Sequence, residues 1–306
     1  MLDLPLFLDE LVPLPKDSVG LAVLGCPIKH SISPQLHQSA LSDMAETDSK
    51  FSNWRYDKIE VPVERLQSAL VSLAKLGYRG LNLTIPHKVE VLPMIEQIDE
   101  GAALIGAVNT LSWENECWKG YNTDGVGFER AVKETFSVDL SEFEVLVLGA
   151  GGASRAAIVQ ALSNGSPKVG LMNRTVERAK ELVNILEDKG FSQLPEILTE
   201  KQVDSFFDSS QKLLVVNATS LGLSPADPAP VSLPKIRKNI FVYDMIYNPP
   251  QTSLLEEAKS LGLLNANGLG MLVGQAAKSL EIWSGANVPI SAMEGAAMKL
   301  FPTSIS

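Results

Sequence analysis

The sequence predicts an α/β protein of two domains, each built on a mostly parallel sheet. Three observations carry this prediction. The 306 residues exceed what one hydrophobic core usually serves. Short apolar runs that end in glycine alternate with amphipathic helical stripes. This alternation restarts after Asp124, as expected where a second α/β unit begins.

The first half alternates strands and helices from residue 19 onward. The run VGLAVLG at 19–25 has the uniform apolarity of a buried parallel strand, and 54–61 and 80–84 are further strands. Apolar residues at helical spacing over 63–76, closed by Gly77, predict a helix. Pro86 suits the first turn of another helix, which places Lys88 in its opening turn.

A hairpin closes the first half. Residues 107–113 and 117–121 are β-rich runs separated by three polar residues, which predicts an antiparallel pair on the mostly parallel sheet.

The second half repeats the strand and helix alternation. We expect helices to residue 135, from the turn after 148 to 162, and at 176–186. We expect strands at 144–148, 168–172, 213–218 and 239–245. The proline-rich segment 224–234 between the last two strands predicts a surface loop.

The last forty residues return to helix, and the apolar stripe at 271–283 suits packing on the first domain. The predicted boundaries are therefore 1–123 plus 267–306 for a substrate domain, and 124–266 for a second, Rossmann-type domain.

Charge and composition exclude several classes of protein. The 26 Lys and Arg residues against 36 Asp and Glu residues give a net charge of −10, which argues against a nucleic-acid partner. Two cysteines and three histidines provide neither a disulfide framework nor a metal-ligand spacing. No apolar run is long enough for a membrane span, and the acidic first twenty residues lack a targeting pattern. We expect a cytoplasmic protein without metal or membrane partner.

A glycine-rich turn lies between an apolar strand and an alanine-rich helix. In this context the turn is typical of a dinucleotide site, where backbone amides face a pyrophosphate. Ser154 stands where the third glycine of this fingerprint is usual, and its small size still suits close packing. The predicted contacts are Gly149, Ala150, Gly151, Gly152 and Ala153.

The end of the next strand indicates which dinucleotide binds. An NAD site normally has a carboxylate here for the ribose 2′-hydroxyl, whereas this chain has Asn173, Arg174 and Thr175. A guanidinium pairs with a 2′-phosphate that a carboxylate would repel, and Arg178 follows on the same helical face. The sequence therefore predicts NADP over NAD.

Four loops of the first half are rich in hydroxyls and amides, namely 30–34, 82–88, 107–110 and 121–124. Ligands of open α/β sheets bind at the carboxyl ends of strands, so these loops are expected to meet at one polar small molecule. A single such residue is usually a turn or capping residue, so the prediction depends on the four loops together. We expect Ser31 and Ser33 to hold a carboxylate, and Asn82, Thr84 and Asn109 to hold hydroxyls.

Lys88 and Asp124 are the charged members of this set. Hydride transfer at a carbonyl also requires a proton, which a positioned lysine can supply or remove. The two residues are the candidate catalytic pair.

The ordered motifs now resemble shikimate dehydrogenase from about residue 20 to 285. They are GCPIKHSISPQLH, NLTIPHK, GAVNT, NTDG, GAGGASRA, NRT, NATSLG, DMIYNPPQT and GLGMLVGQAA. The resemblance implies a mostly parallel α/β substrate domain and a doubly wound NADP-binding domain. It also implies the reversible NADPH-dependent reduction of 3-dehydroshikimate to shikimate, a step of aromatic amino-acid biosynthesis.

The same resemblance implies roles for individual residues. Lys88 and Asp124 match the family's catalytic lysine and aspartate, and Tyr247 and Gln275 join the substrate-binding set. Thr219 and Gly268 join the cofactor contacts. The chain departs from the family pattern at Gln38, where asparagine is common, and in the roughly 18 residues before the first strand.

Two other functions stay open at this point. An enzyme of the same fold that prefers quinate would differ by one substrate hydroxyl, which a polar pocket can discriminate strongly. A non-catalytic NADP-binding sensor would need the cofactor loops but not Lys88 and Asp124 together. The oligomeric state, monomer or homodimer, is also open.

Overall fold

The computed structural model describes residues 4–235 and 239–301. The chain divides into two compact units, residues 1–123 with 273–300 and residues 124–272 with 301–306. It returns to the first unit at Val273, a few residues later than the predicted 267. The reason is that the first turn of helix α10 (Leu269–Ser284) belongs to the second unit, where the Met271 N–H donates to the Tyr243 hydroxyl at 3.1 Å.

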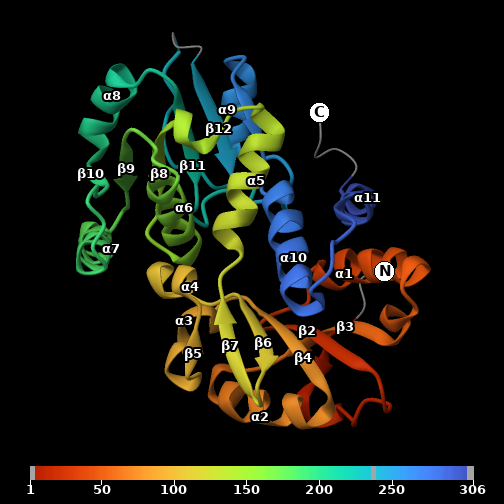
Figure 1. The fold of residues 1–306 in the computed structure, drawn as a ribbon. Coiled ribbons are helices and arrows are strands. Elements are labelled where there is room, and N and C mark those ends of the chain that lie inside the picture. Colours follow the sequence, from red (N-terminus) through yellow and green to blue (C-terminus); the bar gives the residue numbers. More distant parts are fainter. Residues whose placement is uncertain (1–3, 236–238, 302–306) are drawn as a thin grey trace. The chain divides into compact units, whose positions relative to one another are not determined.

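The first unit holds a seven-stranded sheet in the order β1-β3-β2-β4-β6-β7-β5 (Figure 1). β6 lies antiparallel to β4 and β7, and the other pairs are parallel. The strands are β1 (Leu6–Phe7), β2 (Val19–Gly25), β3 (Trp54–Glu60), β4 (Tyr78–Leu83), β5 (Gln97–Ile98), β6 (Thr110–Glu114) and β7 (Cys117–Tyr121).

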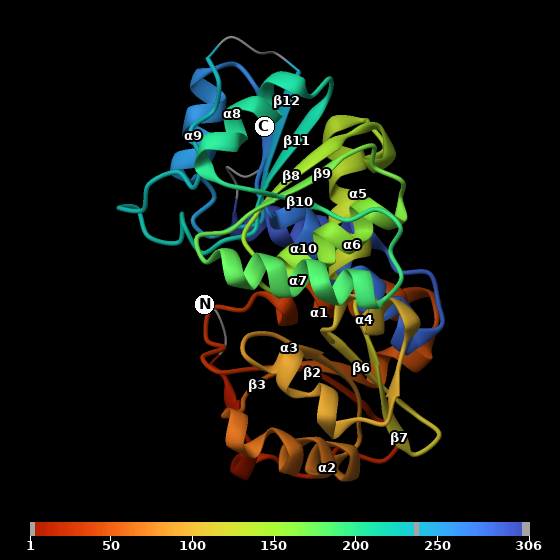
Figure 2. The same cartoon turned by 90° about the vertical axis from the view of Figure 1, so that its left-hand side faces the viewer.

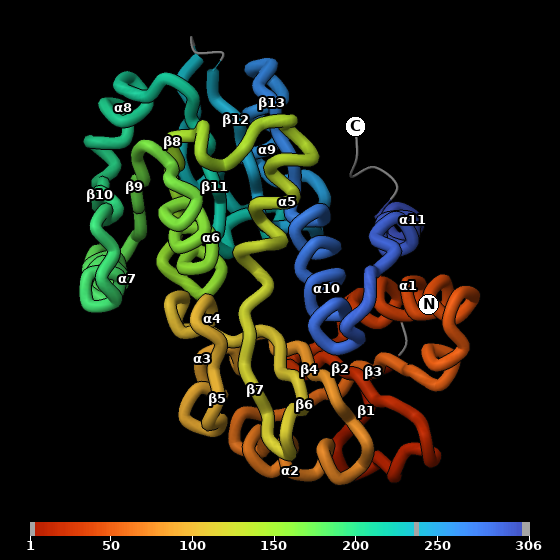
Figure 3. The backbone as a smooth tube through the Cα atoms, viewed as in Figure 1, coloured from red at the N-terminus to blue at the C-terminus, as the bar shows by residue number. Residues whose placement is uncertain are grey.

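Helices cover this sheet and close its core. Figure 3 lets the reader follow the backbone from β2 through α1 into β3, and from β3 through α2 into β4. α2 ends at Gly77, whose φ of 102° lies in the left-handed region that glycine adopts most easily. The helices are α1 (Ser33–Thr47), α2 (Leu66–Leu76), α3 (His87–Glu90), α4 (Glu100–Ile105), α10 and α11 (Ile290–Leu300), with 3₁₀ turns at Leu8–Glu10, Ser49–Asn53, Val63–Arg65 and Leu92–Met94.

The second unit holds a fully parallel six-stranded sheet in the order β10-β9-β8-β11-β12-β13 (Figure 2, with β13 labelled in Figure 3). This is the 3-2-1-4-5-6 order of the Rossmann fold, which confirms the predicted doubly wound class. The strands are β8 (Glu144–Leu148), β9 (Val169–Met172), β10 (Glu196–Leu198), β11 (Leu213–Asn217), β12 (Ile240–Asp244) and β13 (Leu264–Ala266). The helices are α5 (Asp124–Phe136), α6 (Gly152–Ser163), α7 (Val176–Asp188), α8 (Glu200–Ser209) and α9 (Ser253–Ser260), with a 3₁₀ turn at Leu140–Glu142.

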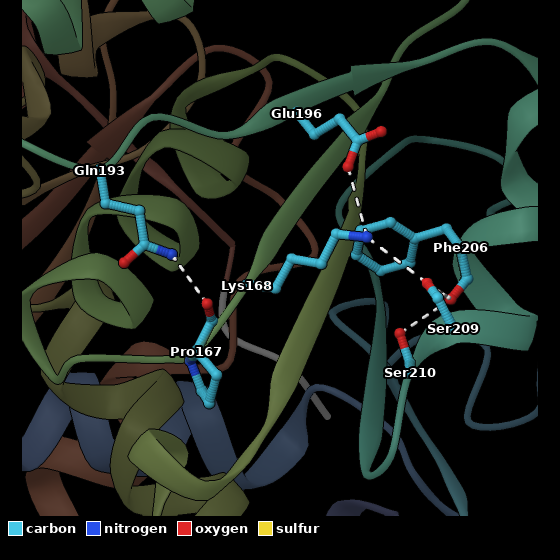
Figure 4. A network of polar contacts seen from close by, with 7 residues as sticks. All are labelled: Pro167, Lys168, Gln193, Glu196, Phe206, Ser209 and Ser210. Atoms are coloured by element: carbon cyan, nitrogen blue, oxygen red, sulfur yellow. Dashed lines mark hydrogen bonds and ion pairs between the residues drawn. The ribbon is translucent and has the colours of Figure 1, made fainter.

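A polar cluster fixes the amino end of this sheet (Figure 4). Lys168, just before β9, places its Nζ 3.4 Å from Glu196 of β10 and 4.1 Å from the centre of the Phe206 ring. Phe206 lies on α8 and fills the space beside Gly170, where a Cβ would come within 2.9 Å of its ring. The cluster therefore holds the amino end together, at the opposite end of the strands from the glycine-rich turn.

Most predicted elements are confirmed to within a few residues. β4 begins at Tyr78, two residues before the predicted start at residue 80, and β6 begins at Thr110, three residues after the predicted start at residue 107. The predicted loop 224–234, described throughout, contains neither helix nor strand. Helices α1, α4, α8 and α9 and the short strands β1, β5, β10 and β13 were not predicted from the sequence. Among the described residues, no helix has both the length and the apolarity that crossing a membrane requires.

Candidate active site

A pair of serine hydroxyls lies beyond the carboxyl end of β2. The Ser31 hydroxyl donates to the Ser33 hydroxyl at 3.2 Å and accepts from the Ser33 N–H at 3.3 Å. Ser33 is the first residue of α1, and the residue before it provides no side-chain cap for the helix. Hydroxyl donors beside the positive end of a helix dipole favour an anion such as a carboxylate.

A largely buried set of amides and hydroxyls lies next to the ends of β4, β6 and β7, with Gln275 partly exposed. We call it the amide network, and it consists of Asn82, Asn109, Thr110, Thr123, Gln275 and Ser279. The Asn82 amide nitrogen donates to the Ser279 hydroxyl at 2.9 Å and to the Thr110 hydroxyl at 3.1 Å. The structure thereby joins a strand of the sheet to helix α10, nearly two hundred residues further along the chain.

Asn109 is the second centre of the amide network. Its amide nitrogen donates to the Thr123 hydroxyl at 3.0 Å and to Gln275 Oε1 at 3.2 Å, and its Oδ1 accepts from the Thr123 N–H at 2.8 Å. Asn82 and Asn109 are both buried, so these bonds are strengthened by the low-dielectric surroundings. The structure brings the predicted Asn82, Asn109 and Gln275 into one rigid polar wall.

Two aromatic groups support this wall from the α1 side. The Tyr56 hydroxyl donates to Asn82 Oδ1 at 2.7 Å, and its ring stacks on His37 with centroids 4.0 Å apart. Burial raises the pKa of Tyr56 well above its usual value, so its hydroxyl stays protonated. Burial lowers the pKa of His37 to about 3, and the neighbouring Asn82 amide only partly opposes that shift.

Lys88 lies half-buried on the short helix α3, as predicted from Pro86. Its main-chain carbonyl accepts from the Val108 N–H at 2.8 Å, one residue before Asn109. Thr84 is also half-buried at the end of β4, where its N–H donates to the Leu24 carbonyl at 3.0 Å. Both residues are thus tied to the same edge of the sheet as the amide network.

Asp124 and Tyr247 belong to the second unit. Asp124 is buried and is the first residue of α5, where a carboxylate interacts favourably with the helix dipole. The Tyr247 ring packs edge-to-face on Phe301 at 5.7 Å, and burial raises the pKa of its hydroxyl.

The glycine-rich turn of the second unit has the geometry of a dinucleotide cradle. Gly149 has φ of 107°, and a Cβ there would come within 2.9 Å of the Ala218 carbonyl oxygen. A Cβ at Gly151 or Gly152 would meet no atom within 4 Å, so the start of α6 leaves space for a ligand beside these two glycines. The Ser154 hydroxyl accepts from the Gly151 N–H at 3.3 Å, and the departure from glycine therefore reinforces the turn. The turn fits a pyrophosphate.

The residues after β9 lie beside this turn, because Met172 pairs with Leu148 and its carbonyl accepts from the Gly149 N–H at 2.8 Å. Asn173 donates to the Thr175 carbonyl at 2.8 Å, which shapes the entry to α7. Arg174 and Arg178 are exposed. An exposed guanidinium at this edge suits a 2′-phosphate.

A buried carboxylate organises the remaining cofactor loops. Asp244 Oδ1 accepts from Asn217 Nδ2 at 3.0 Å, and its Oδ2 accepts from the Thr252 hydroxyl at 2.6 Å. Asn217 Oδ1 in turn accepts from the hydroxyl of Thr219 at 2.8 Å. Burial raises the pKa of Asp244, while these hydrogen bonds oppose the shift.

Gly268, the last predicted cofactor residue, is confined by the backbone around it. A Cβ at Gly268 would come within 2.0 Å of the Met245 carbonyl oxygen, so no other residue fits without movement of the backbone.

Four residues that contact the serine loop or the amide network were not predicted individually from the sequence, namely Tyr56, Lys58, Thr123 and Ser279. Ser279 lies four residues after Gln275, so helical spacing would have placed it on the same face of α10. Tyr56 and Lys58 are two residues apart on β3 and therefore lie on the same face of the sheet. The neighbouring sequence does not indicate which residues they contact.

Three family models match successive parts of the chain. They are a shikimate dehydrogenase substrate binding domain over residues 23–111, a shikimate / quinate 5-dehydrogenase over 130–221, and a shikimate 5′-dehydrogenase C-terminal domain over 268–298.

Relatives of known name match over nearly their whole length. A shikimate dehydrogenase (NADP(+)) of Methanococcus aeolicus is 37% identical over 278 residues, which is 90% of this chain and 95% of the relative. The shikimate dehydrogenase (NADP(+)) of Bacillus subtilis is 36% identical over 272 residues, which is 89% of this chain and 93% of the relative. The structure of the Thermus thermophilus enzyme with NADP(H) and shikimate is 32% identical with a TM-score of 0.79, covering 92% of this chain and 99% of that one. The chain belongs to the shikimate dehydrogenase family.

Proposed function

We propose that this protein catalyses the reversible reduction of 3-dehydroshikimate to shikimate with NADPH. The observation that carries the proposal is the amide network beside the Ser31 and Ser33 hydroxyl pair, on one edge of one sheet. Such a surface suits a small ring that bears several hydroxyls and one carboxylate. The relatives of M. aeolicus and B. subtilis bear the name of this activity.

Each group has a role in the proposed reaction. Ser31 and Ser33 bind the carboxylate, and Asn82, Thr84, Asn109, Tyr247 and Gln275 orient the ring. Lys88 and Asp124 hold and transfer the proton that the substrate oxygen gains during reduction, and loses in the reverse direction. NADPH supplies the hydride when it is bound at the second unit.

The residues of the second unit fit NADP in two places. The glycine-rich turn from Gly149 to Ala153 receives the pyrophosphate at the start of α6, with Thr219 and Gly268 completing the loops around it. Asn173, Arg174, Thr175 and Arg178 receive the 2′-phosphate, since no carboxylate stands at this point of the sequence.

One assay tests the function. Purified protein is mixed with shikimate or quinate, each with NADP or NAD, and the absorbance of the reduced cofactor is followed. We expect the highest kcat/KM with shikimate and NADP. A higher value with quinate would assign the other substrate of the shikimate / quinate family, and reduction of no cofactor would leave only the sensor function. The cytoplasmic location and the monomeric or dimeric state stay predictions.

A further inference from the structure

Lys58 places a positive charge inside the first unit. It lies on β3 opposite Val23 of β2, and only 3% of its surface is exposed. Its Nζ donates to the main-chain carbonyl of Lys29 at 3.0 Å and lies 3.4 Å from that of Ser31. The catalytic and binding roles described above do not include this residue.

Both carbonyls belong to the loop that presents the serine hydroxyl pair. Holding the carbonyl of Ser31 restrains the backbone that carries its hydroxyl, and this hydroxyl bonds to the N–H and the hydroxyl of Ser33. Tyr56, two residues earlier on the same face of β3, holds Asn82 through its hydroxyl. Strand β3 therefore contacts both the loop of the serine hydroxyl pair, through Lys58, and the amide network, through Tyr56.

A buried ammonium is costly unless hydrogen bonds and nearby negative charge compensate it. The two carbonyl oxygens supply part of this compensation. A carboxylate bound at the Ser31 and Ser33 hydroxyls would lie within about 10 Å of the charge, the distance over which salt leaves an attraction largely unscreened. A neutral group at the same place would gain none of this attraction.

We propose that Lys58 is a positioning residue that orders the serine loop and makes this subsite selective for an anion. The proposal deepens the function proposed above and rests on it. Lys58 does not touch the substrate in this assignment, and it acts through the loop and through its charge.

A purely structural role is the alternative explanation. An inward-facing lysine on a strand can serve only to fill and specify its surroundings. Loss of such a residue would impair neutral and charged substrates alike. Discrimination between a carboxylate and its ester therefore separates the two roles.

The experiment compares shikimate with its methyl ester, which lacks the negative charge, at saturating NADP. The proteins are the wild type, Lys58→Met, Lys58→Arg and Lys75→Met, the last an exposed lysine on α2 as the control for net charge. We expect Lys58→Met to lower kcat/KM for shikimate about tenfold or more, mainly through KM, and that for the ester less than about threefold. Lys58→Arg should recover most of the activity on shikimate, and Lys75→Met should equal the wild type.

An equal loss on both substrates, or no loss on either, would overturn the proposal. If circular dichroism shows that Lys58→Met does not fold, Lys58→Gln replaces it in the same comparison, because an amide can still donate to a carbonyl. Calorimetric titration of each protein with shikimate and with the ester reads the anion selectivity without turnover. A wild type that binds shikimate but does not oxidise it with either cofactor would refute the proposed function and leave this inference testable by binding.

Discussion

The two sheets present their carboxyl ends to ligands by different means. In the first unit the edge consists of side chains, and buried amides and hydroxyls bond to one another across β4, β6 and α10. In the second unit the edge consists mainly of backbone, with glycines that leave amides open and arginines that stand in solvent.

This difference follows from what each edge has to recognise. A small hydroxylated ring is distinguished by the direction of a few hydrogen bonds, so the groups that make them need a rigid, buried support. A pyrophosphate needs amides at close range and a phosphate needs a positive charge, neither of which requires burial. A substitution at the edge of the first sheet should therefore disturb other residues of the amide network, whereas a substitution at the edge of the second sheet should affect only its own contacts.

The largest effect is expected at Lys88, the proposed general acid and base. Lys88→Ala should lower kcat by about 100-fold or more, as loss of a general acid or base does, while the Kd for NADP stays within about twofold. Stopped-flow or steady-state assays with shikimate measure the first quantity, and fluorescence titration measures the second.

Lys75→Ala, which removes an exposed lysine from the same unit, is the matched control and should leave kcat unchanged. A comparable loss in Asp124→Asn would support the action of the two residues as a pair. Near-normal turnover in Lys88→Ala would remove this lysine from the mechanism.

Two glycines of the same turn should respond differently, which tests whether the second edge acts through its backbone. Gly149→Ala forces a left-handed alanine against the Ala218 carbonyl and should lower the free energy of unfolding by about 2 kcal/mol or more. Gly151→Ala meets no atom and should leave stability within about 1 kcal/mol, yet weaken NADP binding because the new methyl group occupies the pyrophosphate side. Urea unfolding measures the stability of both variants, and titration with NADP measures their affinity for the cofactor. Unchanged NADP affinity in Gly151→Ala would contradict the assignment of this turn.

The buried support of the first edge should make stability depend on pH. The pKa of His37 falls from 6.5 to about 3 on folding, so the unfolded chain binds a proton more readily between these values. This contribution to stability is fully present above pH 6.5 and is lost as the pH falls toward 3. His37→Phe keeps an aromatic ring against Tyr56 but cannot titrate, so it removes this pH-dependent contribution. Between pH 7.5 and 5 the wild type should lose about 2 kcal/mol more of its free energy of unfolding than the variant does. If the free energy of unfolding varies with pH in the same way for the two proteins, His37 is not held in its neutral form by burial.

The smallest effect is expected at the exposed arginine. Arg174→Ala should weaken NADP binding about tenfold or more and leave NAD binding nearly unchanged, since only the 2′-phosphate loses a partner. Lys180→Ala, which removes an exposed lysine from the helix α7 that follows Arg174, is the control and should alter neither. Equal weakening for both cofactors in Arg174→Ala would place the guanidinium elsewhere on the dinucleotide.

The same contrast explains which parts of the molecule could be predicted from the sequence. The glycine-rich turn, the strand before it and the residues after β9 follow from local rules of backbone geometry, and the structure has them where the sequence placed them. The amide network does not follow from local rules, because Ser279 and Asn82 meet only in the folded chain.

Helix α1 shows why an element itself escaped prediction. Its buried face includes Leu36, Ala40 and Leu41, but it also includes His37 and Ser33, which are polar by type. A periodicity argument counts these two residues against a helix, although the fold buries both. The short strands β1, β5 and β10 escaped for another reason, since strands of two or three residues exist only through the neighbour they pair with.

The first strand has a consequence for handling the protein. β1 pairs with β3 at Ile59 and Glu60, and Asp9 just after it forms two 2.7 Å hydrogen bonds with Arg65. A chain shortened past this point would present the outer side of β3 to solvent, where unpaired N–H and C=O groups invite another chain to add a strand. Affinity tags or truncations chosen for crystallisation should therefore spare β1 and the ion pair between Asp9 and Arg65.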